Sequence, residues 1–354
     1  MALFTTPPAS LCILRLSAIG DVCHTISVVQ AIQQHWPNTK ITWIVGKVEA
    51  PLIQALPNVD VVVFDKKAGW KGMQAVWQAL KGQRFDALLL MQVALRASLL
   101  SFGIRAHYKV GFSRARAKEG QWLFTNKKLP DTQAAHVLDN LAEFARYLGI
   151  PFSHPRWDIP LPADASAFAQ EQITAPTLVI SPAASKDERN WLPERYAQVA
   201  DYAYQQGLNV VLCGSPAPRE VQLGERILSH CHTPVHNLIG QTSLIELVAL
   251  CKQASIVLAP DSGPAHIATT QGTPVIGLYA HSNPARTGPY NSQAHVVDVY
   301  HVHAEKQHGK PVSQLAWGTR VKGDELMQDI TVQAVCTQID HLLASLSHPL
   351  QKRK

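Results

Sequence analysis

Asp21 is the first residue of the chain whose type and position suit chemistry. It follows the turn at residues 17–20, which joins an apolar, strand-like run to the start of a helix. Gly20 lets a ligand approach the backbone closely, and the start of a helix offers free amide groups. Two interpretations of Asp21 follow from this position. Its carboxylate either caps the helix amides or serves as a general base for a bound substrate.

A second polar turn, Asp261-Ser262-Gly263-Pro264-Ala265-His266, follows the apolar run at residues 255–259. Pro264 suits the first turn of a helix, so the amides of Ser262 and Gly263 are predicted to lie free at its N-terminus. Successive free amides bind anions, and a diphosphate is the ligand that we expect beside Asp261 and His266. The alternative is a helix cap followed by a buried histidine.

Further polar residues follow other predicted strands of the second half. Lys186 and Arg189 lie in the segment 181–193, and either side chain could reach a phosphate; the planar guanidinium of arginine offers two parallel donors. Glu220, at the next helix start, is predicted to accept a hydrogen bond from a ribose hydroxyl. Ser243 and Leu244 are predicted to contact the nucleoside to which this ribose belongs.

Positive charge is concentrated in one segment of a chain whose net charge is +6. The basic residues of this segment are Arg96, Arg105, Lys109, Arg114, Arg116, Lys118, Lys127 and Lys128, against Glu119 as the one acid between Leu95 and Lys128. A solvated face is one interpretation of this run. The other is a surface for an anionic partner, either a phosphorylated or acidic substrate or a membrane.

The elements that must position these residues alternate between strand and helix. Apolar runs at residues 11–16, 41–46, 59–64 and 86–91 read as buried strands separated by helices, which is typical of a parallel sheet covered on both faces. Four prolines between residues 151 and 162 indicate a linker, and the same alternation then restarts. The predicted class is α/β, with two doubly wound domains facing a central cleft.

The predicted domain boundaries are residues 1–165 for the first domain and 166–325 for the second. The last helix, within residues 326–354, is expected to pack back on the first domain. The tail at residues 351–354 is basic and is interpreted either as a solubilising end or as a weak attraction to membranes.

Several classes of protein are not indicated by the sequence. The G-x-G-x-x-G, Walker and G-x-S-x-G patterns are absent, and the basic segment carries no nucleic-acid module, so no nucleic acid is expected as a partner. His301, His303 and His308 have no neighbouring carboxylate or cysteine to complete a metal site, so no metal is expected. The six cysteines lack zinc spacing, and neither a signal peptide nor a membrane span is recognised, which favours a cytoplasmic protein.

Three segments together resemble the lipopolysaccharide heptosyltransferases of glycosyltransferase family 9, which have the GT-B architecture. These are Arg15-Leu16-Ser17-Ala18-Ile19-Gly20-Asp21-Val22, Arg189-Asn190-Trp191-Leu192-Pro193 and Asp261-Ser262-Gly263-Pro264-Ala265-His266. Their order and spacing cover roughly residues 10–290. The stretch at residues 98–118 also looks like the subgroup that adds the first heptose to the inner core.

The resemblance implies a donor, an acceptor and roles for the residues. The donor is ADP-L-glycero-D-manno-heptose, and the acceptor is a 3-deoxy-D-manno-octulosonic acid (Kdo) residue on lipid A at the membrane surface. Asp21 matches the catalytic base of an inverting transfer, and the turn at residues 261–266 matches the diphosphate site, with Gly20 beside the donor. The basic run, through Arg96, Arg105, Arg114 and Arg116, is expected to bind the acceptor.

No metal or other cofactor is implied, and the enzyme is expected at the cytoplasmic face of the inner membrane as a peripheral protein. One departure concerns the phosphate cation. Many members of the family carry lysine before a near-adjacent tryptophan and proline, whereas this chain has Arg189 and an inserted Leu192. Either Lys186 or Arg189 therefore fits that role, and no oligomeric state follows from the sequence.

Other functions fit parts of the same pattern. Within the transferases, the acceptor could be a later core sugar or a protein. Outside them, a sugar-nucleotide 2-epimerase or a non-catalytic nucleotide-sugar-binding protein shares the architecture. The basic run argues against the epimerase, which needs no acceptor site.

Overall fold

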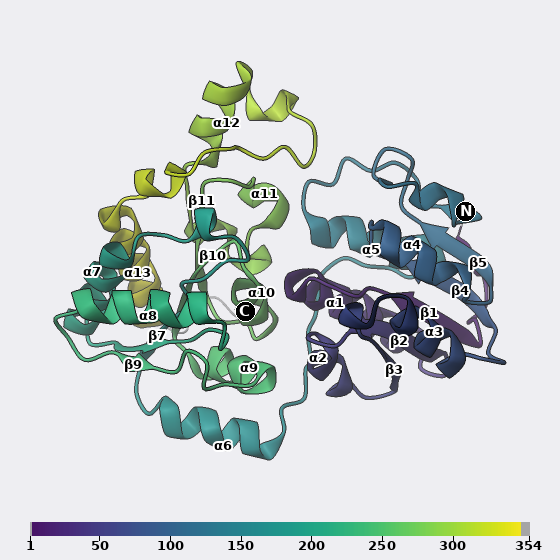
Figure 1. Cartoon of the computed structure of the whole chain (residues 1–354), viewed down its shortest axis with the longest axis horizontal. Coiled ribbons are helices and arrows are strands. Elements are labelled where there is room, and N and C mark those ends of the chain that lie inside the picture. Colours follow the sequence, from purple (N-terminus) through teal and green to yellow (C-terminus); the bar gives the residue numbers. More distant parts are fainter. Residues whose placement is uncertain (1, 348–354) are drawn as a thin grey trace, which may run out of the picture. The chain divides into compact units, whose positions relative to one another are not determined.

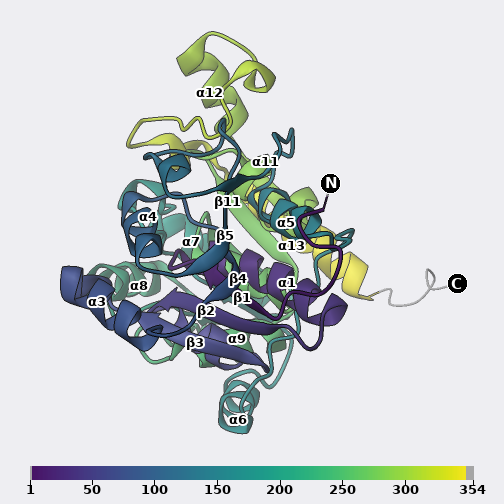
Figure 2. The same ribbon diagram turned by 90° about the vertical axis from the view of Figure 1, so that its right-hand side faces the viewer.

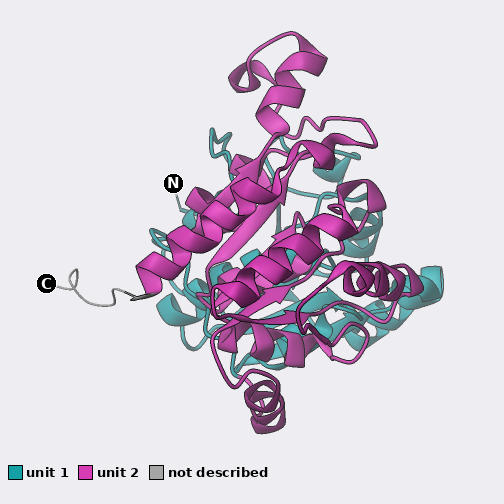
Figure 3. Cartoon of the chain, turned by 90° about the vertical axis from the view of Figure 1, so that its left-hand side faces the viewer, with its two compact units in different colours: residues 1–160 teal, residues 161–354 magenta. Residues whose placement is uncertain are grey.

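The computed structural model describes residues 2–347. Within them the chain divides into two compact units, with the boundary between Pro160 and Leu161; unit 1 precedes it and unit 2 follows it (Figures 1 and 3). The boundary falls inside the proline-rich segment expected to be the linker, at Pro160 instead of residue 165. The basic tail at residues 351–354 lies outside the described residues. Within the described part, no helix is both long and apolar enough to cross a membrane.

Unit 1 is built on a parallel sheet of six strands in the order β3-β2-β1-β4-β5-β6. The strands are β1 (Ser10–Leu14), β2 (Lys40–Gly46), β3 (Val59–Phe64), β4 (Phe85–Leu90), β5 (Ala106–Gly111) and β6 (Lys127–Lys128). The helices are α1 (Ile19–His35), α2 (Ala50–Gln54), α3 (Gly69–Ala79), α4 (Leu95–Phe102) and α5 (Val137–Leu148). Both faces of the sheet are covered, which is why the central strands are apolar throughout.

The two faces of this sheet carry different helices. Alternate side chains of β1, Cys12 and Leu14, share a core cluster with Met73 and Val76 of α3 and Leu100 of α4. Helices α1 and α5 pack against each other on the opposite face (Figure 2). Because successive side chains of a strand point to opposite faces, both sets of helices depend on the same short strands.

Unit 2 repeats this plan with the order β9-β8-β7-β10-β11-β12, again all parallel. The strands are β7 (Thr177–Ile180), β8 (Asn209–Leu212), β9 (His236–Asn237), β10 (Ile256–Pro260), β11 (Val275–Tyr279) and β12 (Val296–Asp298). The helices are α6 (Ala163–Gln172), α7 (Pro193–Gln205), α8 (Pro218–His230), α9 (Leu244–Gln253), α10 (Gly263–Thr270), α11 (Pro284–Thr287), α12 (Tyr300–His308) and α13 (Val332–Ser347). The predicted α/β class with two doubly wound parallel sheets is confirmed.

The strand order fixes where each unit can bind a ligand. In both sheets the order reverses between the first and fourth strands, β1 and β4 in unit 1 and β7 and β10 in unit 2. Ligands of such sheets bind beyond the carboxyl ends of the strands, at this switch point. A ligand-binding site is therefore expected in the loops after these four strands.

The placement expected for the last helix is corrected by the structure. Helix α13 belongs to unit 2, where it packs against α7. Its buried side chains Val335, Ile339 and Leu342 join the same core cluster as Tyr196 of α7. An apolar helical stripe in a sequence shows that a partner exists, but it does not show which unit supplies that partner.

Candidate active site

Asp21 is held by a buried arginine that comes from the end of β1. The Arg15 guanidinium forms an ion pair with Asp21 Oδ2 through Nη2, and its Nη1 donates a hydrogen bond to the Met91 carbonyl at 2.5 Å. The Arg15 side chain is 10 % exposed, whereas that of Asp21 is 31 % exposed. The carboxylate is therefore fixed on its buried side and still reaches solvent.

The capping interpretation of Asp21 is wrong. Helix α1 begins at Ile19 and its N-cap is Ala18, so Asp21 lies inside the first turn and makes no cap hydrogen bond. Among the described residues, no group donates a hydrogen bond to the second oxygen, Oδ1. Gly20 is buried in the same turn. A partly exposed carboxylate with one oxygen engaged by a guanidinium can accept a proton from a substrate through the other.

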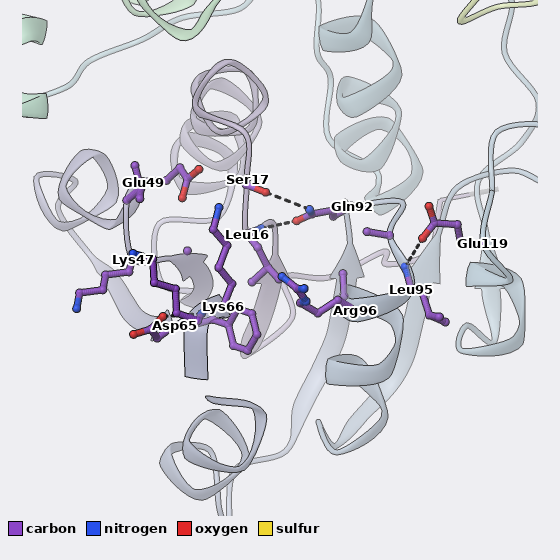
Figure 4. A pocket seen from close by; sticks show the side chains of 16 residues that line it. Leu16, Ser17, Lys47, Glu49, Asp65, Lys66, Gln92, Leu95, Arg96 and Glu119 are labelled. Atoms are coloured by element: carbon purple, nitrogen blue, oxygen red, sulfur yellow. Dashed lines mark hydrogen bonds between the residues drawn. The ribbon is translucent and has the colours of Figure 1, made fainter. Parts of the chain in front are cut away.

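The loops after β1 and β4 are joined by Gln92. Its Oε1 accepts a hydrogen bond from Leu16 N at 2.7 Å, and its Nε2 donates to Ser17 Oγ at 3.4 Å (Figure 4). Gln121 in turn donates to the carbonyls of Leu90 and Gln92. These bonds tie together the two loops that flank the switch point of unit 1.

A cavity of about 530 Å³ opens at this edge of the unit 1 sheet. Its lining comes from the ends of β1, β2, β3 and β4, the start of α4 and Glu119 in the loop after β5 (Figure 4). The charged side chains of the lining are Lys47, Glu49, Asp65, Lys66, Lys67, Arg96 and Glu119, and the others include Leu16, Ser17, Val48, Gln92 and Leu95. Four cations against three carboxylates make it suited to a substrate that carries acidic groups.

Glu49 is the one buried acid of this cavity, at 7 % exposure. Burial raises the pKa of its carboxyl above the usual range, while a backbone hydrogen bond and the charges of Lys66 and Arg15 act in the opposite direction. Gly46 leaves room for it, because a Cβ there would come within 2.6 Å of Glu49 Oε2 and 2.4 Å of the Leu16 carbonyl oxygen.

The four arginines predicted to bind the acceptor do not lie together. Only Arg96 lines the cavity. Arg105 follows the C-terminus of α4, where its carbonyl pairs with Phe85 N at the amino end of β4, the opposite edge of the sheet. Arg114 stacks on the Trp122 ring, at 3.8 Å from its centroid. Arg116 is half-buried and donates to the carbonyls of Thr132 and Ala134.

The cations that do line the cavity, apart from Arg96, were missed by the sequence analysis. Lys47 directly follows β2, and Lys66 and Lys67 follow β3. Their position at carboxyl ends of predicted strands was the signal that could have found them, because those ends meet at one edge of a parallel sheet. A search for dense positive charge along the chain points instead to residues 95–128.

In unit 2, the turn at residues 261–263 lies at the switch point, as predicted. Helix α10 starts at Gly263 with Ser262 as N-cap, Pro264 stands in its first turn, and no side chain caps it. The hydroxyl of Ser262 is buried and has no hydrogen-bond partner in the described part of the chain. His266, one turn into the helix, is 7 % exposed. The helix start is thus open to an acceptor-rich ligand such as a diphosphate.

Arg189 and Asp261 meet beside this turn. Arg189 Nη1 lies 3.7 Å from Asp261 Oδ2, and Ser282 Oγ donates a hydrogen bond of 2.5 Å to the same oxygen. Arg189 is buried, and its Nε has no partner among residues 2–347. The guanidinium compensates the negative charge that Asp261 would otherwise present to an anion at this turn.

Lys186 has a different setting from Arg189. Its side chain is 58 % exposed and lies 3.5 Å from Glu188 Oε1. An exposed lysine with a carboxylate neighbour contributes little to a fixed site. Of the two cations left open by the sequence, Arg189 is the one that lies beside the turn at residues 261–266.

The residues predicted to contact the nucleoside have local partners. Glu220 Oε2 accepts a hydrogen bond from Ser215 N at 2.7 Å, and its Oε1 lies 3.7 Å from Arg219. Ser243 is the N-cap of α9, where it forms a capping box with Glu246 just before Leu244. The bonds of Glu220 lie in the loop after β8, and those of Ser243 lie in the loop after β9. They stabilise these loops and do not identify a ligand.

Metal binding has no candidate cluster in the described residues: no group of three or more histidine, cysteine, aspartate or glutamate side chains is placed to hold an ion. His301 Nδ1 contacts Asp298 Oδ2, and His303 Nε2 lies 2.9 Å from Asp329 Oδ2. Each of these two histidines thus has one carboxylate neighbour, which the sequence did not reveal.

The comparison with known proteins now decides the family. The model of glycosyltransferase family 9 (heptosyltransferase) matches residues 73–317. The chain belongs to glycosyltransferase family 9. It is 51 % identical over 344 residues to the lipopolysaccharide core heptosyltransferase OpsX of Haemophilus influenzae, covering 97 % of this chain and 99 % of that relative. The predicted family and the predicted enzyme class, a glycosyltransferase, are confirmed.

Solved structures of family members share the fold. The family 9 glycosyl transferase of Veillonella parvula superposes with a TM-score of 0.78 at 21 % identity, over 95 % of this chain and 97 % of that one. The Escherichia coli heptosyltransferase WaaC with ADP gives a TM-score of 0.73 at 21 % identity, over 94 % and 99 %. At these identities the likeness establishes the fold of this glycosyltransferase and not its substrates.

Proposed function

We propose that this glycosyltransferase moves L-glycero-D-manno-heptose from ADP-heptose to a Kdo residue of the lipopolysaccharide inner core, with inversion at the anomeric carbon. The observation that carries the proposal is the similarity to OpsX, which extends over nearly the whole of both chains and whose name specifies a lipopolysaccharide core heptosyltransferase. The heptosyltransferase WaaC, which shares the fold, is described with ADP.

The donor is assigned to unit 2. Free amides at the start of α10, the unpartnered Ser262 hydroxyl and the buried Arg189 guanidinium together suit a diphosphate. Preorganised donors of this kind stabilise the charge that grows on a leaving diphosphate as the glycosidic bond breaks, without a metal ion. The proposed reaction therefore needs no cofactor.

The base is assigned to Asp21 of unit 1. Its carboxylate takes the proton of the acceptor hydroxyl while that oxygen attacks the anomeric carbon, and the bond from that carbon to the diphosphate breaks to release ADP. General-base assistance of this kind contributes about 10²–10⁴ in rate. Arg15 acts as a positioning residue, because its ion pair fixes the orientation of the carboxylate.

The acceptor is assigned to the cavity of unit 1. Kdo carries a carboxylate, and Lys47, Lys66, Lys67 and Arg96 supply cations around a volume of about 530 Å³. The wall also contains Leu16, Val48 and Leu95, so a sugar ring could lie against apolar surface while its acid group meets a cation. This assignment replaces the one based on Arg105, Arg114 and Arg116.

The test is a transfer assay with the purified full-length chain, ADP-heptose and lipid A bearing Kdo. We expect ADP release that depends on this acceptor, a product heavier by one heptose, unchanged turnover in a metal chelator and inverted anomeric configuration by NMR. Transfer only to a heptose-bearing core or to a protein would reassign the acceptor. Change of the donor sugar without acceptor would indicate an epimerase, and binding without turnover a non-catalytic protein.

A further inference from the structure

One face of unit 1 exposes large apolar side chains that no described residue covers. Trp70 of α3 is 60 % exposed, and Leu95, Leu99 and Phe102 of α4 are 49 %, 40 % and 79 % exposed. The three residues of α4 follow the spacing i, i+4 and i+7, which places them on a single stripe of the helix. An apolar stripe directed to solvent marks a surface that meets a partner.

Helices α3 and α4 lie on the same side of the unit 1 sheet (Figure 2). The Trp70 and Trp77 rings of α3 meet edge to face at 5.1 Å between centroids. Trp77 Nε1 donates a hydrogen bond of 2.8 Å to the Leu100 carbonyl of α4. The exposed Trp70 is therefore linked through Trp77 to the helix that carries Phe102. We call this surface, with Trp70, Leu95, Leu99 and Phe102 as its apolar residues, the α3–α4 face.

The charge around this face is predominantly positive. From Lys66 to Lys128 the chain carries thirteen lysine and arginine side chains and two acids, Asp86 and Glu119. Both acids are engaged by the backbone: Asp86 Oδ2 accepts from Ser10 N, and Glu119 Oε2 accepts from Leu95 N. The exposed cations on or beside the two helices are Lys66, Lys67, Lys71, Lys81, Arg84, Arg96 and Arg105.

From these observations we infer that the α3–α4 face docks on an anionic lipid bilayer, with Trp70, Leu99 and Phe102 entering the interface and the surrounding cations contacting lipid headgroups. Aromatic and aliphatic side chains ringed by lysine and arginine are the chemistry that such an interface binds. A second copy of the same face would bring like charges together, which opposes a symmetric dimer.

The docking surface is continuous with the cavity. Lys66, Lys67, Leu95 and Arg96 line the cavity and also border the α3–α4 face. This step alone rests on the proposed function. The sugar of a lipid-anchored acceptor would enter the cavity while its lipid stays in the adjacent bilayer. The cations of the border would then serve both headgroups and the acid groups of the acceptor.

The experiment measures co-sedimentation of the full chain with phosphatidylcholine vesicles that contain or lack phosphatidylglycerol. We expect binding only to the anionic vesicles, and added salt should weaken it. The affinity for these vesicles should fall by at least about tenfold in Phe102→Glu and by roughly fivefold in Arg105→Gln. The matched control is Val302→Glu on α12 of unit 2, where the replaced side chain is 68 % exposed; it should bind as wild type does.

A second readout does not depend on these variants. Brominated lipid should quench the tryptophan emission of the wild type, and the quenching should fall in Trp70→Phe. The inference would be overturned if Phe102→Glu and Val302→Glu bound equally well, or if the wild type did not bind anionic vesicles. It would also be overturned if the wild type formed a dimer that Phe102→Glu dissociates. Phe102→Glu should also retain turnover on a soluble, deacylated acceptor, so loss of docking is distinguishable from failure of the proposed function.

Discussion

Replacing Asp21 by asparagine tests the assigned base with a change that keeps the size and shape of the side chain. If Asp21 is the base, as proposed, the variant cannot take the acceptor proton, so kcat should fall by about 10²–10⁴. Donor binding should be retained, because the residues that suit the diphosphate all lie in unit 2. The assay pairs ADP release in the presence of acceptor with calorimetric titration of ADP-heptose.

The same change has a calculable effect on stability. Breaking a fully buried ion pair costs about 3–5 kcal/mol of unfolding free energy. Here Asp21 is 31 % exposed, the asparagine oxygen can still accept a hydrogen bond from Arg15, and Arg15 keeps its bond to the Met91 carbonyl. The cost should therefore be nearer 1 kcal/mol, which lowers the midpoint of a unit of this size by about 2–4 °C.

A matched control separates the two effects. Asp60→Asn removes an exposed carboxylate from β3 of the same unit and should leave both turnover and the unfolding midpoint unchanged. Turnover of Asp21→Asn within tenfold of wild type would refute the assignment of the base. Loss of turnover together with loss of donor affinity would refute the separation of the two roles.

Three further predictions concern other residues. Arg189→Ala should raise the Kd for ADP by about 10–100-fold, since a charge-assisted hydrogen bond is lost, whereas Lys186→Ala should change it little; titration calorimetry compares the two. Burial raises the pKa of Glu49, so the folded chain keeps that proton to higher pH than the unfolded chain does, and stability is lost as the pH rises through the folded-state pKa. The stability of Glu49→Gln relative to wild type should therefore increase from acidic pH to neutrality. Thermal unfolding measures this difference, and a difference that does not change with pH would contradict the prediction. Ile339→Ala should destabilise unit 2 by about 2–5 kcal/mol in denaturant unfolding, and an unaffected unit 2 would argue against the packing of α13 on α7.

Much of the fold was predictable because its signals are local. Apolar runs such as residues 11–16 and 41–46 became β1 and β2, and the alternation with helices predicted two parallel sheets. The position of Asp261 at a strand end also followed from the sequence. The packing of α13 did not follow, because the hydrophobic pattern of a helix is the same whichever core it joins.

The site was only partly predictable, for a geometric reason. Arg96 and Arg105 belong to the same basic run, but they lie at opposite ends of α4, so only Arg96 reaches the cavity. The ion pair between Arg15 and Asp21 was equally hidden, because the partner of a first-turn carboxylate depends on how the preceding strand ends. The charge of a sequence segment thus predicts the sign of a surface better than it predicts where each charged side chain lies in the fold.

The identical strand order of the two sheets has a consequence for how such an enzyme can diversify. In each unit the loops after the first and fourth strands lie at the switch point of the sheet, while the strands themselves carry the core. Substitutions in the loops after β1 to β4 alter the proposed acceptor cavity and leave the loops after β7 and β10 unchanged. If unit 1 binds the acceptor and unit 2 the nucleotide sugar, as proposed, new acceptor specificities can arise in one half of the gene without change in the other.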